Sequence, residues 1–187
     1  MIIFTKTKDL KVLASTVVKD GNPITGGIHF KKHPLGGILA MVTDGYTLIS
    51  LYDEDGTWED ETSEFMLEGD KKSLEHLLPL GNNFTAFTPG QHEFNVIVGA
   101  FPYSAVIPRD GEKSNRFSKV AYLAASVITR FNEIAKKLNA GTPLLHINNR
   151  LTVEALFTLR KDVYMIAMPA VQKERPYFER PNFMINL

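Results

Sequence analysis

The chain has no cysteine and no excess of charge of either sign, because its 187 residues include 21 basic and 21 acidic side chains. The lack of cysteine excludes disulfides and thiolate metal sites and fits a reducing compartment. The balanced charge excludes a strongly basic nucleic-acid binder but allows a local basic face. No apolar run approaches the roughly 20 residues that cross a bilayer, and Met1–Lys6 does not resemble the start of a signal peptide. We therefore expect a soluble, cytoplasmic protein without membrane contacts.

Motifs that carry catalytic chemistry are also lacking. The sequence has no glycine loop ending in Gly-Lys-Ser/Thr to hold a phosphate, and no Gly-x-Ser-x-Gly elbow to present a nucleophile. Its five histidines are scattered, which favours surface or strand-edge positions over a metal site. An acidic run could bind a cation, although a solvated loop is the favoured interpretation. That run comprises Asp53, Asp55, Glu59, Asp60 and Glu61. We expect no enzyme activity, no cofactor and no metal site.

Hydrophobic periodicity predicts about three rounds of strand, helix and several strands. Apolar residues at helical spacing predict helices over Lys8–Lys19, Asp70–Leu78 and Leu123–Leu138. Runs bounded by turn residues predict strands over Ile2–Thr5, Gly27–Phe30, Gly37–Val42, Tyr46–Tyr52, Glu64–Leu67, Phe84–Thr88, Phe94–Val98, Phe117–Ala121, Leu144–Ile147, Leu151–Phe157 and Val163–Met168. Asp44-Gly45 is a strong hairpin signal between two of them. The pattern predicts an α+β fold with helices on one side of antiparallel sheets.

Five segments carry motifs in a distinctive order. Val42–Leu48 contains Thr-Asp-Gly, Leu67–Leu78 includes a short predicted helix, and Gly99–Pro108 contains Phe-Pro and ends in Ile-Pro. Phe117–Leu123 leads from a strand into a helix, and Val163–Pro169 ends in Met-Pro. Each motif alone has an ordinary interpretation as a turn, loop or strand end. Their order and spacing together resemble the bacterial sliding clamp family, the β subunit of DNA polymerase III. The family's corresponding motifs are Ala-Thr-Asp-Gly-His-Arg-Leu, the linker Gly-Arg-Phe-Pro-Asp-Tyr-x-x-Val-Leu-Pro, which is one residue longer, and the ending Ala-Tyr-Val-Val-Met-Pro.

This resemblance implies a DNA-clamp-like fold in a shortened chain. Family clamps are rings of six similar domains, each with two strand–helix–strands units, in which helices line the hole and sheets form the outside. By this plan residues 1–108 form a clamp-like domain of two units and residues 109–171 a half-domain of one unit. Residues 172–187 form a tail that is either disordered or docked on an apolar surface. Four copies would supply the twelve units of a ring, so we expect a homo-oligomer, and the reduced size suggests a phage or mobile element.

The resemblance also implies a pocket for short peptides of DNA polymerase and other replication proteins. A hydrophobic groove with an adaptable methionine suits such a ligand. The alternative is that these apolar residues simply pack a domain junction, and the two interpretations are nearly even. Matched residue by residue, the expected pocket comprises Thr43, Gly45, Tyr46, Thr47, Leu48, Pro102, Val106, Tyr122, Val153, Ile166, Met168 and Pro169.

Double-stranded DNA is the second partner that the resemblance implies, through nonspecific contacts with phosphates. The candidate DNA-facing residues lie on the polar sides of the predicted helices: Lys8, Lys11, Lys19, Lys71, Lys72, Arg130, Lys136 and Lys137. A solubilising helix face is the default interpretation of such charges. Glu75 and Glu133 on the same helices make the face less positive than a clamp hole. The function expected first is a clamp-like processivity factor. The alternative is a clamp-fold interaction module, such as a phage-encoded decoy of the replication machinery, that does not encircle DNA.

Overall fold

The computed structural model describes residues 1–18, 25–59, 61–69, 71–77, 85–87, 96–97, 125–147 and 152–168. The helices and strands follow in the order β1 (Ile2–Phe4), α1 (Thr7–Ala14), β2 (Gly27–Lys32), β3 (Ile38–Thr43), β4 (Thr47–Asp53), β5 (Thr57–Trp58), β6 (Glu64–Glu68), α2 (Lys71–Leu77), β7 (Thr85–Phe87), β8 (Val96–Ile97), α4 (Ala125–Lys137), β9 (Pro143–Ile147), β10 (Val153–Phe157) and β11 (Val163–Ala167). The predicted strand over Phe117–Ala121 lies outside the described residues.

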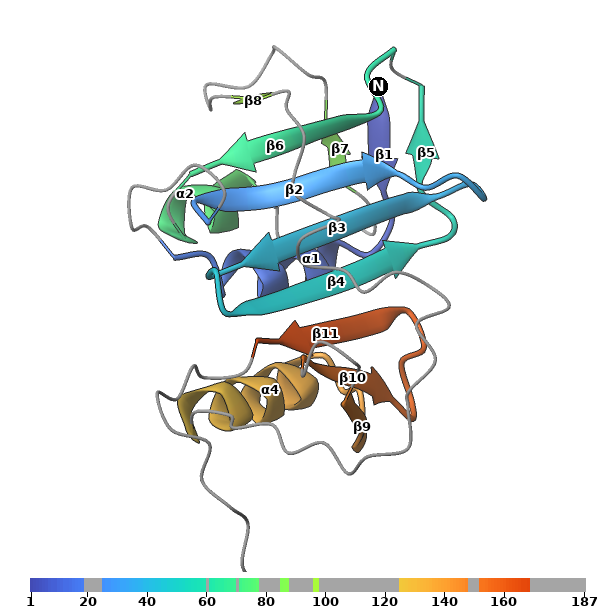
Figure 1. The fold of residues 1–187 in the computed structure, drawn as a ribbon. Coiled ribbons are helices and arrows are strands. Elements are labelled where there is room, and N and C mark those ends of the chain that lie inside the picture. The colour runs from blue at the N-terminus through green and yellow to red at the C-terminus, as the bar shows by residue number, and fades with distance from the viewer. Residues whose placement is uncertain are drawn as a thin grey trace, which may run out of the picture.

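The strands form two sheets within the described part of the chain. The larger has the order β8-β6-β2-β3-β4-β11-β10-β9 and contains both N-terminal and C-terminal strands, while β5-β1-β7 form the smaller (Figure 1). All of these strand pairs are antiparallel. The pairing of β4 with β11 joins the N-terminal elements to the C-terminal hairpins in one continuous sheet. The predicted boundary at residue 108 lies outside the described residues, so the division into domains stays a prediction.

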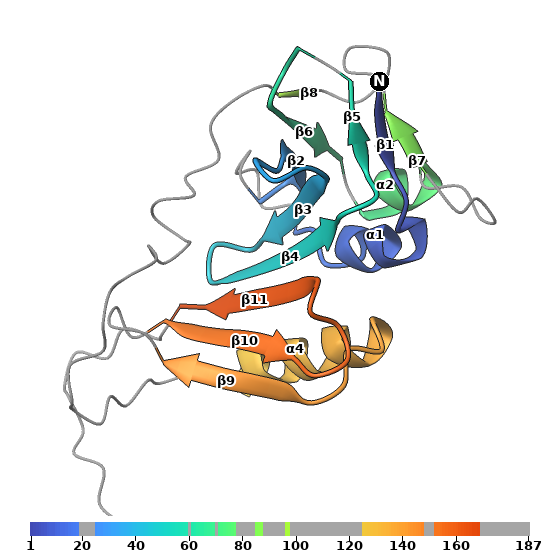
Figure 2. The ribbon, with the colours of Figure 1, turned by 90° about the vertical axis from the view of Figure 1, so that its right-hand side faces the viewer.

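The helices cover one face of the larger sheet. Leu13 of α1, Leu74 of α2 and Phe131 of α4 belong to a single core cluster with Ile49 of β4 and Met165 of β11. Figure 2 shows α1 and α2 together on one side of β2, β3 and β4. Apolar residues at helical spacing produce this arrangement, because each helix presents one apolar stripe to the sheet. The predicted α+β class with helices on one side of antiparallel sheets is confirmed, while the number of repeated units stays a prediction.

Aromatic side chains fill the part of the core between the two sheets. Phe4 of β1 meets Phe30 of β2 edge to face, with ring centroids 6.0 Å apart. Phe30 in turn stacks on Phe65 of β6 at 4.8 Å. Trp58 of β5 lies 5.6 Å from Phe65 and donates from Nε1 to the Thr62 carbonyl oxygen at 2.5 Å. Aromatic pairs at these separations add to the stabilisation that burial of their area provides.

Two sequence predictions need correction. The first helix ends at Ala14 rather than Lys19. The hydroxyls of Ser15 and Thr16 donate to the carbonyl oxygens of Val12 and Leu13, each at 2.7 Å, and such local bonds compete with helix continuation.

The second correction concerns the acidic run, of which Asp60 lies outside the described residues. Asp53 is not solvated. It is buried at the end of β4 and accepts hydrogen bonds from the Thr5 amide at 2.5 Å and the Thr5 hydroxyl at 2.6 Å. Asp55, Glu59 and Glu61 are exposed as expected.

Candidate functional site

The β3–β4 hairpin presents the first predicted pocket segment. Asp44 Oδ1 accepts hydrogen bonds from the amides of Tyr46 and Thr47 at 2.9 and 2.6 Å, and from the Thr47 hydroxyl at 2.9 Å. The Thr43 hydroxyl accepts from the Gly45 amide at 3.0 Å and donates to the Thr47 carbonyl oxygen at 2.8 Å. Gly45 has φ +85°, a left-handed conformation that favours glycine. The Thr-Asp-Gly motif therefore builds a turn whose backbone groups are held by its own side chains.

Strand β11 brings the last predicted pocket segment beside this hairpin. Ile166 lies opposite Leu48 in the β4–β11 pairing. The Met168 amide, just beyond the strand, donates to the Tyr46 carbonyl oxygen at 2.7 Å. Residues more than 100 positions apart in the sequence thus meet where β4 pairs with β11. Val153 is buried and pairs with Ala167, so it lies on the opposite face from Ile166.

A second, smaller apolar cluster lies on the sheet face away from the helices. It consists of buried Met41, Leu48 and Ile166, with partly buried Leu39 and Tyr164 packed against it. Successive side chains of a strand point to opposite faces of the sheet, which explains why this cluster is separate from the main core. The residues next to its members along the strands belong to the core on the helix side. We call this group the outer cluster. The predicted pocket included Leu48 and Ile166 but not the other three, which strand alternation on β3 and β11 could have indicated.

The predicted pocket residues differ in accessibility. Leu48 and Ile166 are each 1% exposed, whereas Tyr46 is 71% exposed and Met168 is partly buried. The outer cluster is therefore buried, whereas Tyr46, at its end, is exposed and Met168 is partly exposed. Four further predicted pocket residues lie outside the described residues: Pro102, Val106, Tyr122 and Pro169.

The predicted DNA-facing residues that the structure describes lie on the helices, which share one side of the sheet. Those on exposed positions are Lys8, Lys71, Lys72, Lys136 and Lys137, whereas Lys11 is partly buried and Lys19 lies outside the described residues. Arg130 differs from them because it forms an ion pair with Asp44 and donates to the Thr16 carbonyl oxygen at 3.0 Å. Its charge is therefore already engaged within the protein. Lys136 and Lys137 also lie in the last turn of α4, where the helix dipole favours positive charge.

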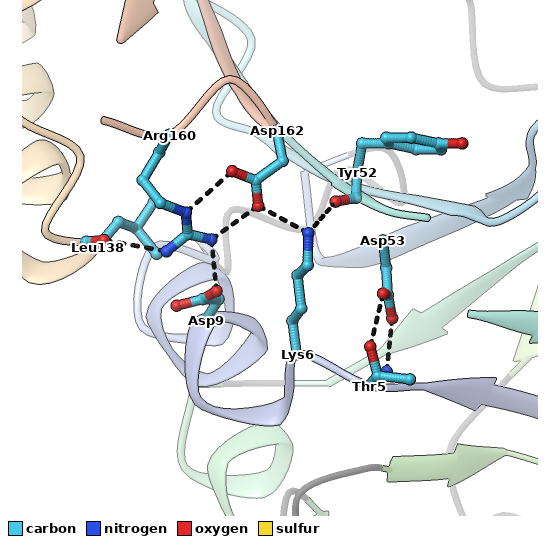
Figure 3. A network of polar contacts seen from close by, with 8 residues as sticks. All are labelled: Thr5, Lys6, Asp9, Tyr52, Asp53, Leu138, Arg160 and Asp162. Atoms are coloured by element: carbon cyan, nitrogen blue, oxygen red, sulfur yellow. Dashed lines mark hydrogen bonds and ion pairs between the residues drawn. The ribbon is translucent and has the colours of Figure 1, made fainter. Parts of the chain in front are cut away.

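A polar network that no sequence pattern predicted occupies the other end of β4 (Figure 3). Lys6 Nζ donates to the Asp162 carboxylate at 2.8 Å and to the Tyr52 carbonyl oxygen at 2.7 Å. Arg160 donates to both Asp162 oxygens at 2.9 and 2.8 Å, and to Asp9 at 2.6 Å. These residues border an open cleft of about 660 Å³ that contains none of the predicted pocket residues.

The network shifts the protonation equilibria of two of its members. Burial alone would raise the pKa of Asp162, but hydrogen bonds from Arg160 and Lys6, together with their charges, hold that pKa well below its usual value. Hydrogen bonds to Asp162 and Asp9 hold the pKa of Arg160 above its usual value, although burial opposes them. Both groups are therefore charged at neutral pH. The arrangement has the character of a structural ion network rather than of an acid–base pair, because neither pKa moves toward neutrality.

The described ranges contain neither a metal-ligand cluster nor a helix suited to cross a membrane. No group of three or more His, Cys, Asp or Glu side chains is placed to hold a metal ion there. In the same ranges, no helix has the length and apolar character that a membrane crossing requires.

Comparison with known proteins identifies the fold. No protein-family model matches the chain, and no curated protein matches it in sequence. The solved structure of DNA polymerase III subunit beta from Borrelia burgdorferi, in complex with a natural product, superposes with a TM-score of 0.61 at 12% identity, covering 91% of this chain and 64% of the other. The beta subunit from Thermotoga maritima gives a TM-score of 0.54 at 12% identity, covering 94% and 66%. This chain thus has the DNA polymerase III beta-subunit fold and spans slightly less than two thirds of those chains.

Proposed function

We propose that this protein is a sliding-clamp-like, DNA-associated processivity factor that binds short peptide motifs of replication proteins. The observation that carries the proposal is the meeting of the hairpin and β11, where Leu48 pairs with Ile166 and Met168 bonds to Tyr46. The beta-subunit fold supports it, and two of the motifs that first indicated the family, Val42–Leu48 and Val163–Met168, lie side by side. A fold alone does not specify a function, so the proposal depends on this site.

The outer cluster and its accessible end suit a short apolar peptide. Such ligands bind through a few buried side-chain anchors, with backbone groups fixing their orientation. Met168 is unbranched and polarisable and can adapt to different anchors. Tyr46 offers an exposed aromatic face with a polar hydroxyl, a combination enriched at binding surfaces. Tyr46 and Thr47 stand where the family has histidine and arginine, so we expect a preference for clients different from that of the family.

Peptide binding is tested by fluorescence anisotropy with a labelled Gln-Leu-x-Leu-Phe peptide. We expect Met168→Asp and Tyr46→Asp to weaken binding about tenfold or more, or ~1.4 kcal/mol, because each places a charge where the peptide's apolar groups would lie. Leu35→Asp is the matched control, since Leu35 is 88% exposed in the β2–β3 turn, at the other end of β3. Leu48→Asp is expected to abolish binding too, but it buries a charge and must be checked for folding by circular dichroism. Equal binding by the wild type, Met168→Asp and Tyr46→Asp would refute the site assignment.

The DNA role is tested by solution mass and salt-dependent binding to nicked circular DNA. We expect an oligomer by analytical ultracentrifugation and a binding constant that falls as salt rises, since phosphate contacts release counterions. Replacing Lys71, Lys72, Lys136 and Lys137 with Gln should flatten that dependence. A monomeric mass together with no DNA binding at low salt would exclude the processivity role.

The alternative function is a clamp-fold interaction module that binds peptides without encircling DNA, for example a decoy of replication proteins. A specific observation favours it: Arg130 is paired within the protein, and exposed Glu133 lies on the same helix. The helix side therefore has less free positive charge than the sequence suggested. Peptide binding by a monomer that does not bind DNA would establish this alternative.

A further inference from the structure

Asp44 has a role beyond shaping its own turn. One of its carboxylate oxygens organises the hairpin by accepting from the Tyr46 and Thr47 amides. The other accepts from Arg130 of α4. The Asp44 and Arg130 side chains are only 17% and 21% exposed, so solvent screens the pair less than it would a surface ion pair. The conformation of the turn is thereby tied to the position of α4.

Arg130 connects three elements that are distant in sequence. Besides Asp44 in the β3–β4 turn, it donates to the carbonyl oxygen of Thr16, which follows α1. A guanidinium can make both contacts at once because its donors form a rigid planar fork, whereas a lysine ammonium has no such fork. Arg130 therefore fixes the turn relative to both helices, and not merely to α4.

The connection continues from the turn to the predicted binding residues. The Tyr46 amide bonds to Asp44, and the Tyr46 carbonyl oxygen accepts from the Met168 amide at 2.7 Å. An unbroken series of polar contacts thus runs from Arg130 on the helix side to Met168 at the end of β11. Tyr46 is the exposed group in this series.

We infer that Arg130 is a positioning residue for peptide binding, and that it is not a DNA contact. This inference rests on the proposed peptide site and assigns a residue that acts on it from the opposite side of the sheet. A restrained turn holds Tyr46 and Met168 in the conformation that binds the peptide. Peptide binding then does not have to bear the entropy cost of ordering these two residues. Without Arg130, the turn keeps its internal hydrogen bonds but loses its attachment to the helices.

The test compares Arg130→Gln with Lys136→Gln, which removes the same charge from an exposed position on the same helix. We expect Arg130→Gln to weaken binding of the Gln-Leu-x-Leu-Phe peptide about tenfold and to leave the salt dependence of DNA binding unchanged. Lys136→Gln should leave peptide affinity unchanged. Arg130→Lys should restore peptide affinity only in part, since it keeps the charge without the fork.

Amide hydrogen exchange separates positioning from general destabilisation. Positioning requires faster exchange in Arg130→Gln at the amides of Tyr46, Thr47 and Met168, with little change at Leu51 in the middle of the sheet. If the wild type binds the peptide and Arg130→Gln binds it with the same affinity, this inference is overturned and the proposed function is not. Absence of peptide binding by the wild type would overturn the proposed function and this role with it. A uniform rise in exchange throughout the sheet would assign Arg130 a purely structural role and also overturn the inference.

Discussion

Replacing Arg160 with Gln should destabilise the protein substantially. Arg160 makes two hydrogen bonds to Asp162 and one to Asp9, and donates to the Leu138 carbonyl oxygen at 3.1 Å. Breaking a fully buried ion pair costs about 3–5 kcal/mol, whereas an exposed pair contributes about 1 kcal/mol or less. The Arg160 side chain is 22% exposed and thus lies between these limits. We expect a loss of about 2–3 kcal/mol in the free energy of unfolding.

This loss is measurable by thermal and urea unfolding. For a chain of this size, 1 kcal/mol lowers the Tm by about 2–4 °C, so Arg160→Gln should lower it by roughly 5–10 °C. Lys161→Gln is the matched control, because it removes the same charge from the adjacent, exposed position. Arg160→Lys should show an intermediate loss, since one ammonium cannot reproduce the fork that reaches α1, α4 and Asp162. A loss in Arg160→Gln no larger than that of the control would refute the reasoning.

Three further predictions follow from the packing and charges. First, folding lowers the pKa of Asp162. The ionised Asp162 side chain therefore contributes its full stabilisation above the unfolded pKa of about 3.9, and this stabilisation is lost as the pH falls through the lower folded pKa. Acid unfolding below about pH 4 should be steeper in the wild type than in Asp162→Asn. Second, Gly37→Ala should destabilise more than Gly36→Ala in urea unfolding. Both glycines have positive φ, but only at Gly37 would a Cβ lie 2.4 Å from a backbone atom, the Asp53 carbonyl oxygen; equal losses would show that the turn relaxes. Third, Phe30→Ala should cost about 3–5 kcal/mol by urea unfolding, because Phe30 is buried between Phe4 and Phe65; a loss below 1 kcal/mol would mean that the cavity collapses.

Local signals in the sequence were sufficient for most of the secondary structure. Apolar runs bounded by turn residues predicted β3 and β4, and Asp44-Gly45 predicted the hairpin between them, which the structure confirms. The helical spacing of Val127, Phe131 and Ile134 predicted α4 and its buried face. The two-residue strand β5 was missed, since two residues carry no periodicity.

The polar contacts between elements could not be predicted in the same way. Arg130 and Asp44 are 86 positions apart, and Arg160 and Asp9 are 151 apart. A charged residue on a polar helix face has the same pattern whether it meets solvent, DNA or a carboxylate of the same chain. Assigning Arg130 to DNA was therefore a reasonable prediction from its position on α4, but the position of its partner is determined only by the fold. The meeting of Leu48 and Ile166 was foreseen only because the family resemblance placed both motifs at one site.

Two arginines secure the β4–β11 junction from opposite ends. Arg130 attaches the turn before β4 to the end of α1, and Arg160 attaches the turn before β11 to α1 and to the end of α4. Along β4, at about 3.3 Å per residue, these points lie roughly 20 Å apart. Rotating the C-terminal hairpins away from β4 would have to break both sets of contacts as well as the strand pairing between them. The N-terminal elements and the C-terminal hairpins are therefore expected to stay joined at this junction.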